Sequence, residues 1–181
     1  MGARVLVTGL SSFWGGRIAQ ALEATPGIDV IVGLDTEVPV LQFQRTEFVR
    51  ADESYSILSR LVRATQVDTV VHAGVVVDST SLPSGRLHER NVIGTMNLLA
   101  AVSDPACQVR SLVVKSSTLV YGASNRDPMF FRETMTRAGP ARTRAERSLL
   151  EAEEYVHDFA EDHPALSVAV LRCANVLGAN I

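Results

Sequence analysis

Six short apolar runs alternate with helical patterns along the whole chain, and this alternation limits the folds that the chain can adopt. The runs are continuous, which is typical of strands that are covered on both faces. They lie at residues 4–7, 28–35, 46–50, 67–72, 109–117 and 167–172. Between them the pattern predicts helices at residues 15–24, 54–64, 84–103 and 141–161, and a polar loop at residues 122–140. The repeated β-α-β order predicts an α/β fold with a doubly wound parallel sheet and helices on both faces.

The composition fits one globular domain. Of the 181 residues, 46% are hydrophobic and 20% are charged, which is enough for a substantial core. The formal net charge of -3 disfavours a nucleic-acid or anionic-membrane surface, and no apolar stretch approaches the roughly 20 residues that span a bilayer. Cys107 and Cys173 lie far apart without metal-ligand spacing, so we expect no metal site. The chain starts with a core strand and shows no export signal, which predicts a cytoplasmic protein.

The first strand ends in a glycine turn. Thr8 and Gly9 close the strand, and Gly15 opens the next helical pattern. Glycines at such a turn let the pyrophosphate of a dinucleotide approach unpaired amides at a helix N-terminus. The spacing is T-G-x-x-x-x-x-G, with Ser12 where the usual G-x-x-G-x-x-G pattern has its middle glycine. An ordinary strand-to-helix connection is the alternative interpretation.

An acidic residue ends the second predicted strand. Asp35 lies about twenty residues beyond the glycine turn, where a carboxylate can accept hydrogen bonds from a ribose diol and repel a 2′-phosphate. This position favours NAD over NADP as the ligand. Together, the turn and Asp35 predict a Rossmann-type dinucleotide site, although an aspartate that merely begins a loop is the alternative.

Six ordered motifs resemble those of one protein family. They are T-G-L-S-S-F-W-G from Thr8, F-V-R-A-D ending at Asp52, V-V-H-A-G ending at Gly74, N-V-I-G-T-M-N-L-L from Asn91, K-S-S-T-L-V-Y-G ending at Gly122, and L-R-C-A-N-V-L-G from Leu171. In this order they resemble the extended short-chain dehydrogenase/reductases, specifically the NAD-dependent nucleotide-sugar epimerase/dehydratase group that includes UDP-glucose 4-epimerase. The resemblance covers essentially the whole chain. It implies NAD as cofactor and a nucleotide sugar as substrate.

The resemblance also implies roles for single residues. The cofactor-binding residues would be Gly9, Ser12, Phe13, Trp14, Gly15, Asp35, Asp52, Ala73 and Gly74. Ser117 matches the hydroxyl that polarises the substrate, and Asn91 matches the helix asparagine that supports the active site. The alternatives are that Ser117 only terminates a strand and that Asn91 only satisfies a buried backbone group. His72 is predicted to be a packed residue at a strand end.

The family's catalytic tyrosine and lysine, four residues apart, are missing. In the family the phenol acts as acid and base because neighbouring positive charge lowers its pKa. The best register places Thr143 at the tyrosine position and Arg147 at the lysine position, and a shifted register places Pro140 and Arg144 there. A threonine hydroxyl does not ionise near neutral pH, and a guanidinium stays charged with a different hydrogen-bond geometry. Ordinary epimerase or dehydratase chemistry therefore lacks its usual acid and base.

Two functions follow from these motifs. The first is an NAD-dependent epimerase/dehydratase of which residues 1–181 are the NAD-binding domain, with the substrate domain absent from this chain because family members continue well beyond the last motif. The chain would then be either a fragment or a natural remnant. The second is a non-catalytic NAD-binding sensor or scaffold. A second copy of the chain is a further expected partner, because relatives pair through the two long helices predicted at residues 84–103 and 141–161.

Overall fold

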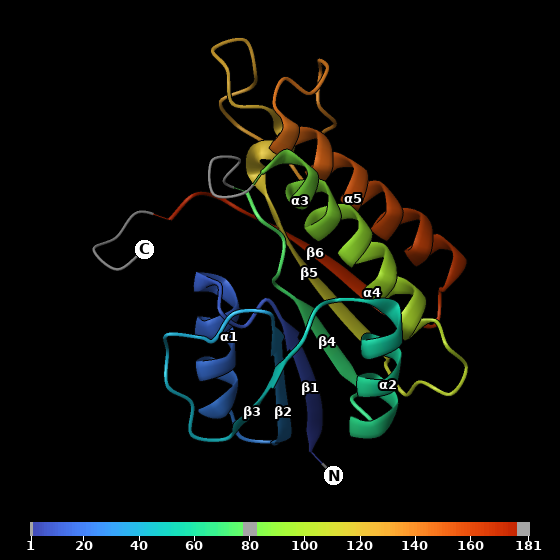
Figure 1. Cartoon of the computed structure of the whole chain (residues 1–181). Helices are drawn as coiled ribbons and strands as arrows, with labels where there is room; N and C mark the ends of the chain where they lie inside the picture. Colours follow the sequence, from blue (N-terminus) through green and yellow to red (C-terminus); the bar gives the residue numbers. More distant parts are fainter. Residues whose placement is uncertain (1, 78–82, 177–181) are drawn as a thin grey trace.

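The computed structural model describes residues 2–77 and 83–176 and contains one six-stranded parallel sheet (Figure 1). The strands follow the order β3-β2-β1-β4-β5-β6 across the sheet. Their bounds are Ala3–Thr8 for β1, Ile28–Asp35 for β2, Thr46–Arg50 for β3, Thr69–His72 for β4, Ser111–Ser117 for β5 and Ser167–Cys173 for β6. The predicted α/β parallel sheet is therefore confirmed.

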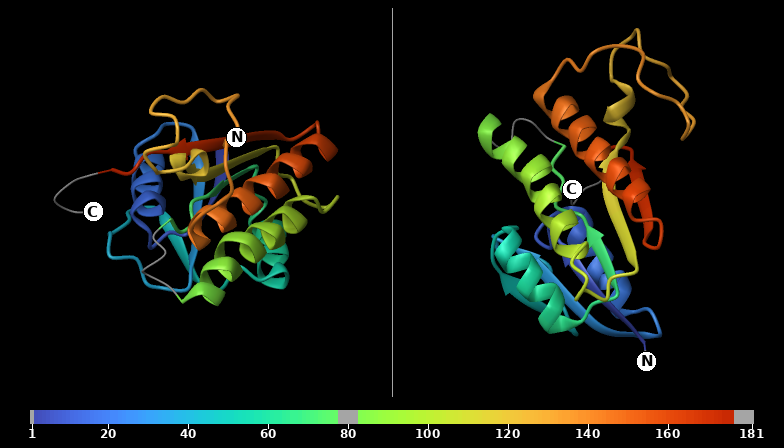
Figure 2. Two further views of the ribbon diagram at one scale, coloured as in Figure 1. Left: turned by 90° about the horizontal axis from the view of Figure 1, so that it is seen from above. Right: turned by 90° about the vertical axis from the view of Figure 1, so that its right-hand side faces the viewer.

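Helices lie on both faces of the sheet, as the continuous apolar runs predict (Figure 2). The edge strand β6 differs, because its residues alternate and Leu171, on the α1 side, is 50% exposed. On one face α1 (Phe13–Glu23) packs against Val5, Val7 and Ile31 through Ala19. On the other face lie α2 (Tyr55–Thr65), α4 (Gly94–Val102) and α5 (Arg144–Asp162). There Leu58, Leu98 and Val156 share one buried cluster with Leu6 of β1. Neighbouring residues of β1 thus belong to opposite cores, which is why the strand carries no polar alternation.

The predicted helix at residues 84–103 is a composite helix ending at Val102. It begins as α3 (Ser84–His88), passes through a π-helical turn, η1 (Glu89–Ile93), and continues as α4. Such turns occur mostly as single inserts within α-helices, frequently at functional sites. This insert carries Arg90 and Asn91. It therefore changes the direction in which these two side chains leave the helix.

Side-chain caps decide where two other helices begin. Ser12 accepts a hydrogen bond from the Gly15 amide, so α1 begins at Phe13 and not at Gly15 as predicted. Thr143 accepts from the Glu146 amide at 3.1 Å, so α5 begins at Arg144 and not at residue 141. These hydroxyls satisfy amides that the first helical turn leaves without a partner. A short 3₁₀ turn, η2 (Thr118–Tyr121), follows β5 before the loop at residues 122–140.

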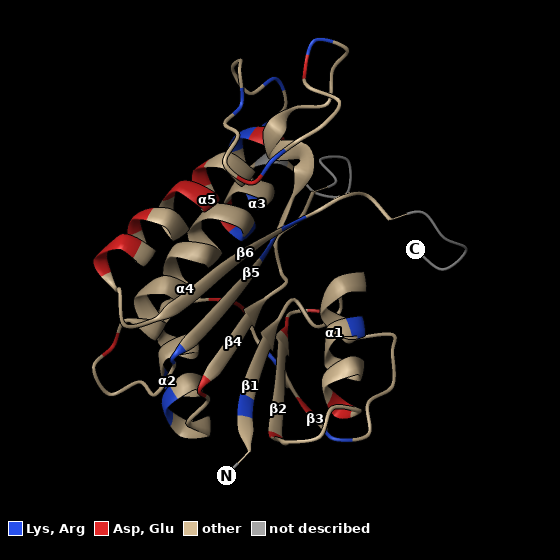
Figure 3. Cartoon of the chain, turned by 180° about the vertical axis from the view of Figure 1, so that it is seen from behind, with Lys and Arg blue, Asp and Glu red and all other residues tan. Residues whose placement is uncertain are grey.

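Within residues 2–77 and 83–176 no helix is both long and apolar enough to cross a bilayer. In the same part of the chain no group of three metal-ligating side chains comes together. Figure 3 shows that acidic side chains gather along α5. The negative charge of the chain is thus concentrated on a solvated helix at one side of the molecule.

Candidate dinucleotide site

The candidate site lies at the carboxyl ends of the strands, where the strand order reverses. β1 pairs with β2 on one side and with β4 on the other, so the crossovers from β1 and β4 run in opposite directions. Ligands of doubly wound sheets bind in the crevice at this reversal. The glycine turn, Asp35 and Gly74 all lie at this point, as the sequence predicts.

The glycine turn is closely packed against the loop after β4. Gly9 has a φ of +71°, and a Cβ placed on it would lie 2.4 Å from the Gly74 Cα. A Cβ on Gly15 would lie 2.1 Å from the carbonyl oxygen of Gly9. The first helical amides of α1 have no acceptor within the helix and lie directly after this turn. The backbone therefore requires both glycines and presents a helix N-terminus at the crevice.

Ser12 closes the turn with its own side chain. Its Oγ donates to the Gly9 carbonyl at 2.7 Å and accepts from the Gly15 amide at 3.0 Å. Because these contacts point into the turn, the serine hydroxyl does not block the outer side of the helix N-terminus. The amides of Phe13 and Trp14 remain there for an anionic ligand.

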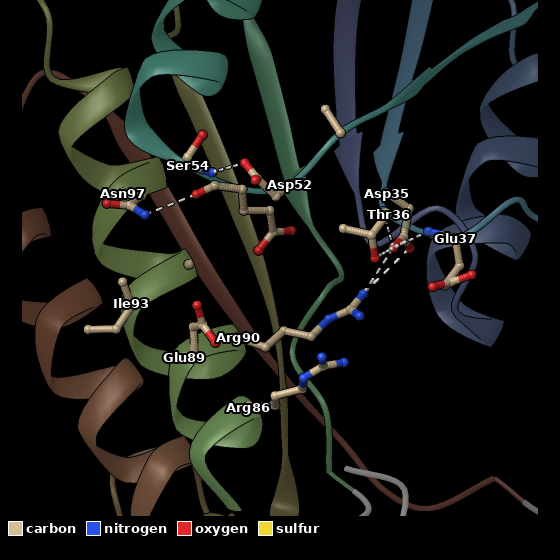
Figure 4. Close-up of a pocket in the computed structure, with 13 residues that line it drawn as sticks. Asp35, Thr36, Glu37, Asp52, Ser54, Arg86, Glu89, Arg90, Ile93 and Asn97 are labelled. Atoms are coloured by element: carbon tan, nitrogen blue, oxygen red, sulfur yellow. Dashed lines mark hydrogen bonds and ion pairs between the residues drawn. The ribbon is translucent and has the colours of Figure 1, made fainter. Parts of the chain in front are cut away.

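A cavity of about 410 Å³ lies at the carboxyl end of β2 (Figure 4). We name it the Asp35 cavity; its wall includes Asp35, Asp52, Glu53, Arg90, Ile93 and Asn97. It brings the predicted residues Asp35 and Asp52 together from β2 and from the loop after β3. Arg90, Glu53 and Asn97 were not predicted, because their relation to Asp35 depends on how η1 and α4 pack beside the sheet.

Asp35 accepts hydrogen bonds on both of its carboxylate oxygens. Its Oδ2 accepts from the Ser11 hydroxyl at 2.6 Å and from the Ser11 amide at 2.9 Å, and Arg90 reaches its Oδ1 at 3.3 Å. Burial by itself would raise the pKa of Asp35, but the two Ser11 hydrogen bonds and the charge of Arg90 outweigh it and lower the pKa. Asp35 is therefore a carboxylate at neutral pH and can act only as a hydrogen-bond acceptor. Asp52 is ionised for a different reason, since hydrogen bonds from Ser54 lower its pKa.

A second cavity, of about 490 Å³, lies on the other side of Arg90, and we name it the Lys115 cavity. The N-terminus of α1 lines it through Ser11, Ser12, Phe13 and Trp14; Gly74, Lys115, Ser117, Cys173 and Asn175 line it from the strand ends. Arg90 borders both cavities and donates from Nε to the Gly74 carbonyl at 3.2 Å. The two cavities are therefore neighbours on either side of Arg90, and we refer to them together as the crevice.

Ser117 opens into the crevice, whereas Asn91 stands behind it. Ser117 lines the Lys115 cavity and a neighbouring hollow that includes Gly122, Phe131 and Asn175. Asn91 is fully buried, and its amide group bonds both the N–H and the C=O of Val76 at 2.8 Å. It also donates to the Ser148 hydroxyl of α5 at 3.0 Å. Asn91 therefore holds the cavity wall to α5 and does not face the crevice.

The predicted positions of the missing pair do not face the crevice. Thr143 caps α5 with an exposed side chain, and the side chains of Arg147, Pro140 and Arg144 are exposed as well. The buried residues of this helical stretch are Ala145, Glu146, Ser148 and Leu149, of which Leu149 packs against Val75 and Val120. The helix phase thus moves the inward-facing pair to Ala145 and Leu149, neither of which is a tyrosine or a lysine.

The last motif is only partly described. Asn175 and Val176 line the Lys115 cavity, whereas Leu177 and Gly178 lie outside the described residues. Ala73 is buried at the end of β4, and its carbonyl lies 3.4 Å from the Ser12 hydroxyl.

His72 is packed at the end of β4, as predicted, and it is neutral. The hydroxyl of Thr95 donates to the Asn91 carbonyl at 2.6 Å, so Nε2 of His72 must donate to Thr95 at 3.0 Å. The other ring nitrogen then accepts from the Thr8 hydroxyl at 2.6 Å. Burial lowers the pKa of His72 below its ordinary value of 6.5. Both ring nitrogens are therefore hydrogen-bonded within the protein, and neither is free to bond a ligand.

This arrangement predicts an acid-sensitive fold. Below pH 6.5 the unfolded chain protonates His72 while the folded chain does not, so unfolding takes up a proton and the free energy of unfolding falls as pH falls. The slope from this residue approaches about 1.4 kcal/mol per pH unit. Urea denaturation between pH 7.5 and 5 measures it. His72→Gln should flatten the slope and His157→Gln, which alters an exposed residue of α5, should keep it; equal slopes for the two variants would contradict the assignment.

One protein family matches nearly the whole chain: the model of the NAD dependent epimerase/dehydratase family covers residues 5–180. The chain is 36% identical over 179 residues to an uncharacterized protein of Mycobacterium tuberculosis, covering 96% of this chain and 47% of that protein. It is 27% identical over 194 residues to UDP-glucose 4-epimerase 3 of Oryza sativa subsp. japonica, covering 99% and 50%. The chain therefore spans about half the length of the curated relatives it matches.

Solved structures share the fold. The chain matches UDP-glucose-4-epimerase from Stenotrophomonas maltophila, solved with bound NAD and formylated UDP-arabinopyranose, with a TM-score of 0.77 and 24% identity over 94% of this chain and 52% of the other. It matches a Bordetella bronchiseptica enzyme in complex with NAD⁺ with a TM-score of 0.80 and 22% identity, over 98% and 57%. At these identities the likeness concerns the fold alone.

Proposed function

The chain belongs to the NAD-dependent epimerase/dehydratase family, and we propose that it forms the NAD-binding domain of an enzyme that acts on a nucleotide sugar. The observation that carries the proposal is the position of the Asp35 carboxylate. It lies between the helix N-terminus of α1 and the Asp35 cavity, where the strand order reverses. A dinucleotide needs these two elements side by side: amides for its pyrophosphate and a carboxylate for its adenosine ribose.

The described residues fit an extended dinucleotide. Asp35 would accept hydrogen bonds from the ribose hydroxyls, and the amides of Phe13 and Trp14 would bind the pyrophosphate. The adenine would lie in the Asp35 cavity beside Asp52 and Ile93. Ser117 would bond the oxygen on the substrate's reacting carbon, because Ser117 lines the Lys115 cavity. When bound, the nicotinamide supplies the capacity to accept and return a hydride.

The substrate site extends beyond these residues in this proposal. The hollow beside Ser117, lined by Gly122, Phe131 and Asn175, would take the sugar. A second domain, outside this chain, would hold the nucleotide, since the curated relatives are about twice as long. We also propose that two copies pair through the outer sides of α4 and α5, where Met96 and Tyr155 are exposed.

Calorimetric titration of the 181-residue chain with NAD tests the proposal. We expect saturable binding, with NADP weaker because its 2′-phosphate would meet the Asp35 carboxylate. Asp35→Ala should weaken NAD binding roughly tenfold to a hundredfold, the equivalent of about 1–3 kcal/mol for hydrogen bonds to a charged group. Glu37→Ala is the matched control, since Glu37 is an exposed residue of the same cavity.

Two results would overturn the proposal. One is that neither dinucleotide binds at millimolar concentration, and the other is that the Asp35 and Glu37 variants bind NAD equally well. Binding of NAD by a full-length protein that turns over no nucleotide sugar would favour the sensor or scaffold instead.

A further inference from the structure

The single lysine of the chain lies in the crevice beside Ser117. Lys115 and Ser117 are two residues apart on β5, so their side chains leave the sheet on the same face. Both line the Lys115 cavity, together with the N-terminus of α1 and Asn175. β5 is an inner strand between β4 and β6. The amine is therefore brought to the point where the predicted cofactor site meets the predicted substrate hydroxyl.

This lysine is buried without a carboxylate. Lys115 is 7% exposed, and its Nζ donates to the Val75 carbonyl at 3.3 Å. Among the described residues that line the cavity there is no aspartate or glutamate. Lysine is seldom buried unless it is paired with an acid, because removing a charged amine from water is costly. An unpaired buried amine that borders a cavity is instead typical of a functional site.

The surroundings of Lys115 lower the pKa of its amine. Burial lowers the pKa of Lys115 from its ordinary value of 10.5, whereas the Cys173 thiol of β6 opposes this shift. The other charged or titratable groups that face it are His72 of β4 and Arg90 of η1. His72 is neutral, and Arg90 adds positive charge, which disfavours a second cation nearby.

In the first turns of α5 the buried acid Glu146 is paired with Arg137. The other buried positions there are Ala145, Ser148 and Leu149, and the Leu149 side chain packs against Val75 and Val120. Because Val75 is also the residue whose carbonyl accepts from Lys115, the leucine and the lysine approach the same stretch of backbone from different elements. The buried positions of α5 thus supply no lysine, whereas Lys115 on β5 places an amine at the crevice.

We propose that Lys115 and Ser117 are the proton-transfer pair of this site, in place of a tyrosine and lysine on α5. This inference rests on the proposed function. In its unprotonated form, Nζ would take the proton of the substrate hydroxyl, so that an O–H bond breaks and an N–H bond forms. The nicotinamide dinucleotide, when bound, would supply the two-electron oxidant that accepts the hydrogen of the same carbon as hydride. Ser117 Oγ accepts from the Leu119 amide at 3.2 Å, which leaves its own proton to bond the substrate oxygen.

The first test measures the amine directly. Because Lys115 is the only lysine, its peptide reports a single ε-amine after pulsed acetylation with acetic anhydride across a range of pH. We expect the reactivity to titrate below pH 10.5 in the folded chain, and at the ordinary value in urea. Saturating NAD should slow acetylation at least tenfold, whereas the α-amino group, the internal reference, should be unaffected.

The outcomes separate this inference from the proposed function. A chain that binds no NAD by calorimetry overturns both. A chain that binds NAD overturns this inference alone if Lys115 titrates at its ordinary value or is not protected.

Substitution in the full-length protein gives the second test. Lys115→Met should lower kcat about 10²-fold to 10⁴-fold, the usual contribution of a positioned acid or base, while NAD affinity stays within about threefold. Lys115→Arg keeps a positive donor for the Val75 carbonyl but does not release its proton. It should therefore be as inactive as the methionine variant. An active arginine variant would show that Lys115 only holds the backbone.

Discussion

Replacing Gly9 with alanine should destabilise the chain by about 2–5 kcal/mol. The left-handed conformation at a φ of +71° costs a residue with a Cβ about 1–2 kcal/mol. The new Cβ would also lie 2.4 Å from the Gly74 Cα, and forcing an extra carbon into packed backbone costs about 1–3 kcal/mol. Urea denaturation measures the loss. Any relief of the clash must move the loop after β4, so NAD binding should weaken as well.

Gly27→Ala is the matched control for this variant. Gly27 has a φ of +84°, and a Cβ placed on it meets nothing within 4 Å. It should therefore lose only the conformational part, about 1–2 kcal/mol. Equal losses at Gly9 and Gly27 would mean that the contact between the turn and the β4 loop is not tight.

Removing the Glu146 carboxylate should cost about 3–5 kcal/mol, the usual result of leaving one partner of a buried ion pair unpaired. Glu146 Oε2 lies 2.6 Å from Arg137 Nη2, and both side chains are 5% exposed or less. The same oxygen accepts from the Arg142 amide at 2.7 Å. The pair attaches the loop at residues 122–140 to the first turn of α5. Glu146→Ala, followed by urea denaturation, tests this role.

Two further variants test whether the stability loss of Glu146→Ala arises because its carboxylate is buried. Glu161→Ala removes a carboxylate of the same helix that is 71% exposed and pairs with His157, so it should change stability by less than about 0.5 kcal/mol. The double variant Arg137→Met with Glu146→Leu should recover most of the loss, because two apolar side chains leave no buried charge. A double variant as unstable as Glu146→Ala would contradict this explanation.

Local features of the chain account for the positions of several predicted site residues. Gly9 and Asp35 each lie where a strand ends, and the carboxyl ends of parallel strands meet at one edge of the sheet. Their meeting follows from the strand order alone. Ser117, at the end of β5, reaches the crevice for the same reason.

Residues on helices could not be placed in this way. Counting from a motif put Thr143 and Arg147 at the catalytic positions, but the Thr143 cap sets the helix phase so that Ala145, Ser148 and Leu149 turn inward. Arg90 could not be related to Asp35, 55 residues earlier, without the π-helical turn that redirects its side chain. A helix rotates each residue by about 100°, so an error of one residue in its start changes which side chains face the site.

The order and type of the strands are determined by the sequence itself, because continuous apolar runs between helical patterns can be buried only as a sheet covered on both faces. The glycine turn is likewise local, since its backbone permits nothing larger. The tertiary structure alone decides which polar groups share the crevice. Lys115 and Arg90 become site residues through the packing of β4, β6 and η1 around them, and burial then sets their protonation and their partners. Such contacts join residues far apart in the chain, and no local pattern records them.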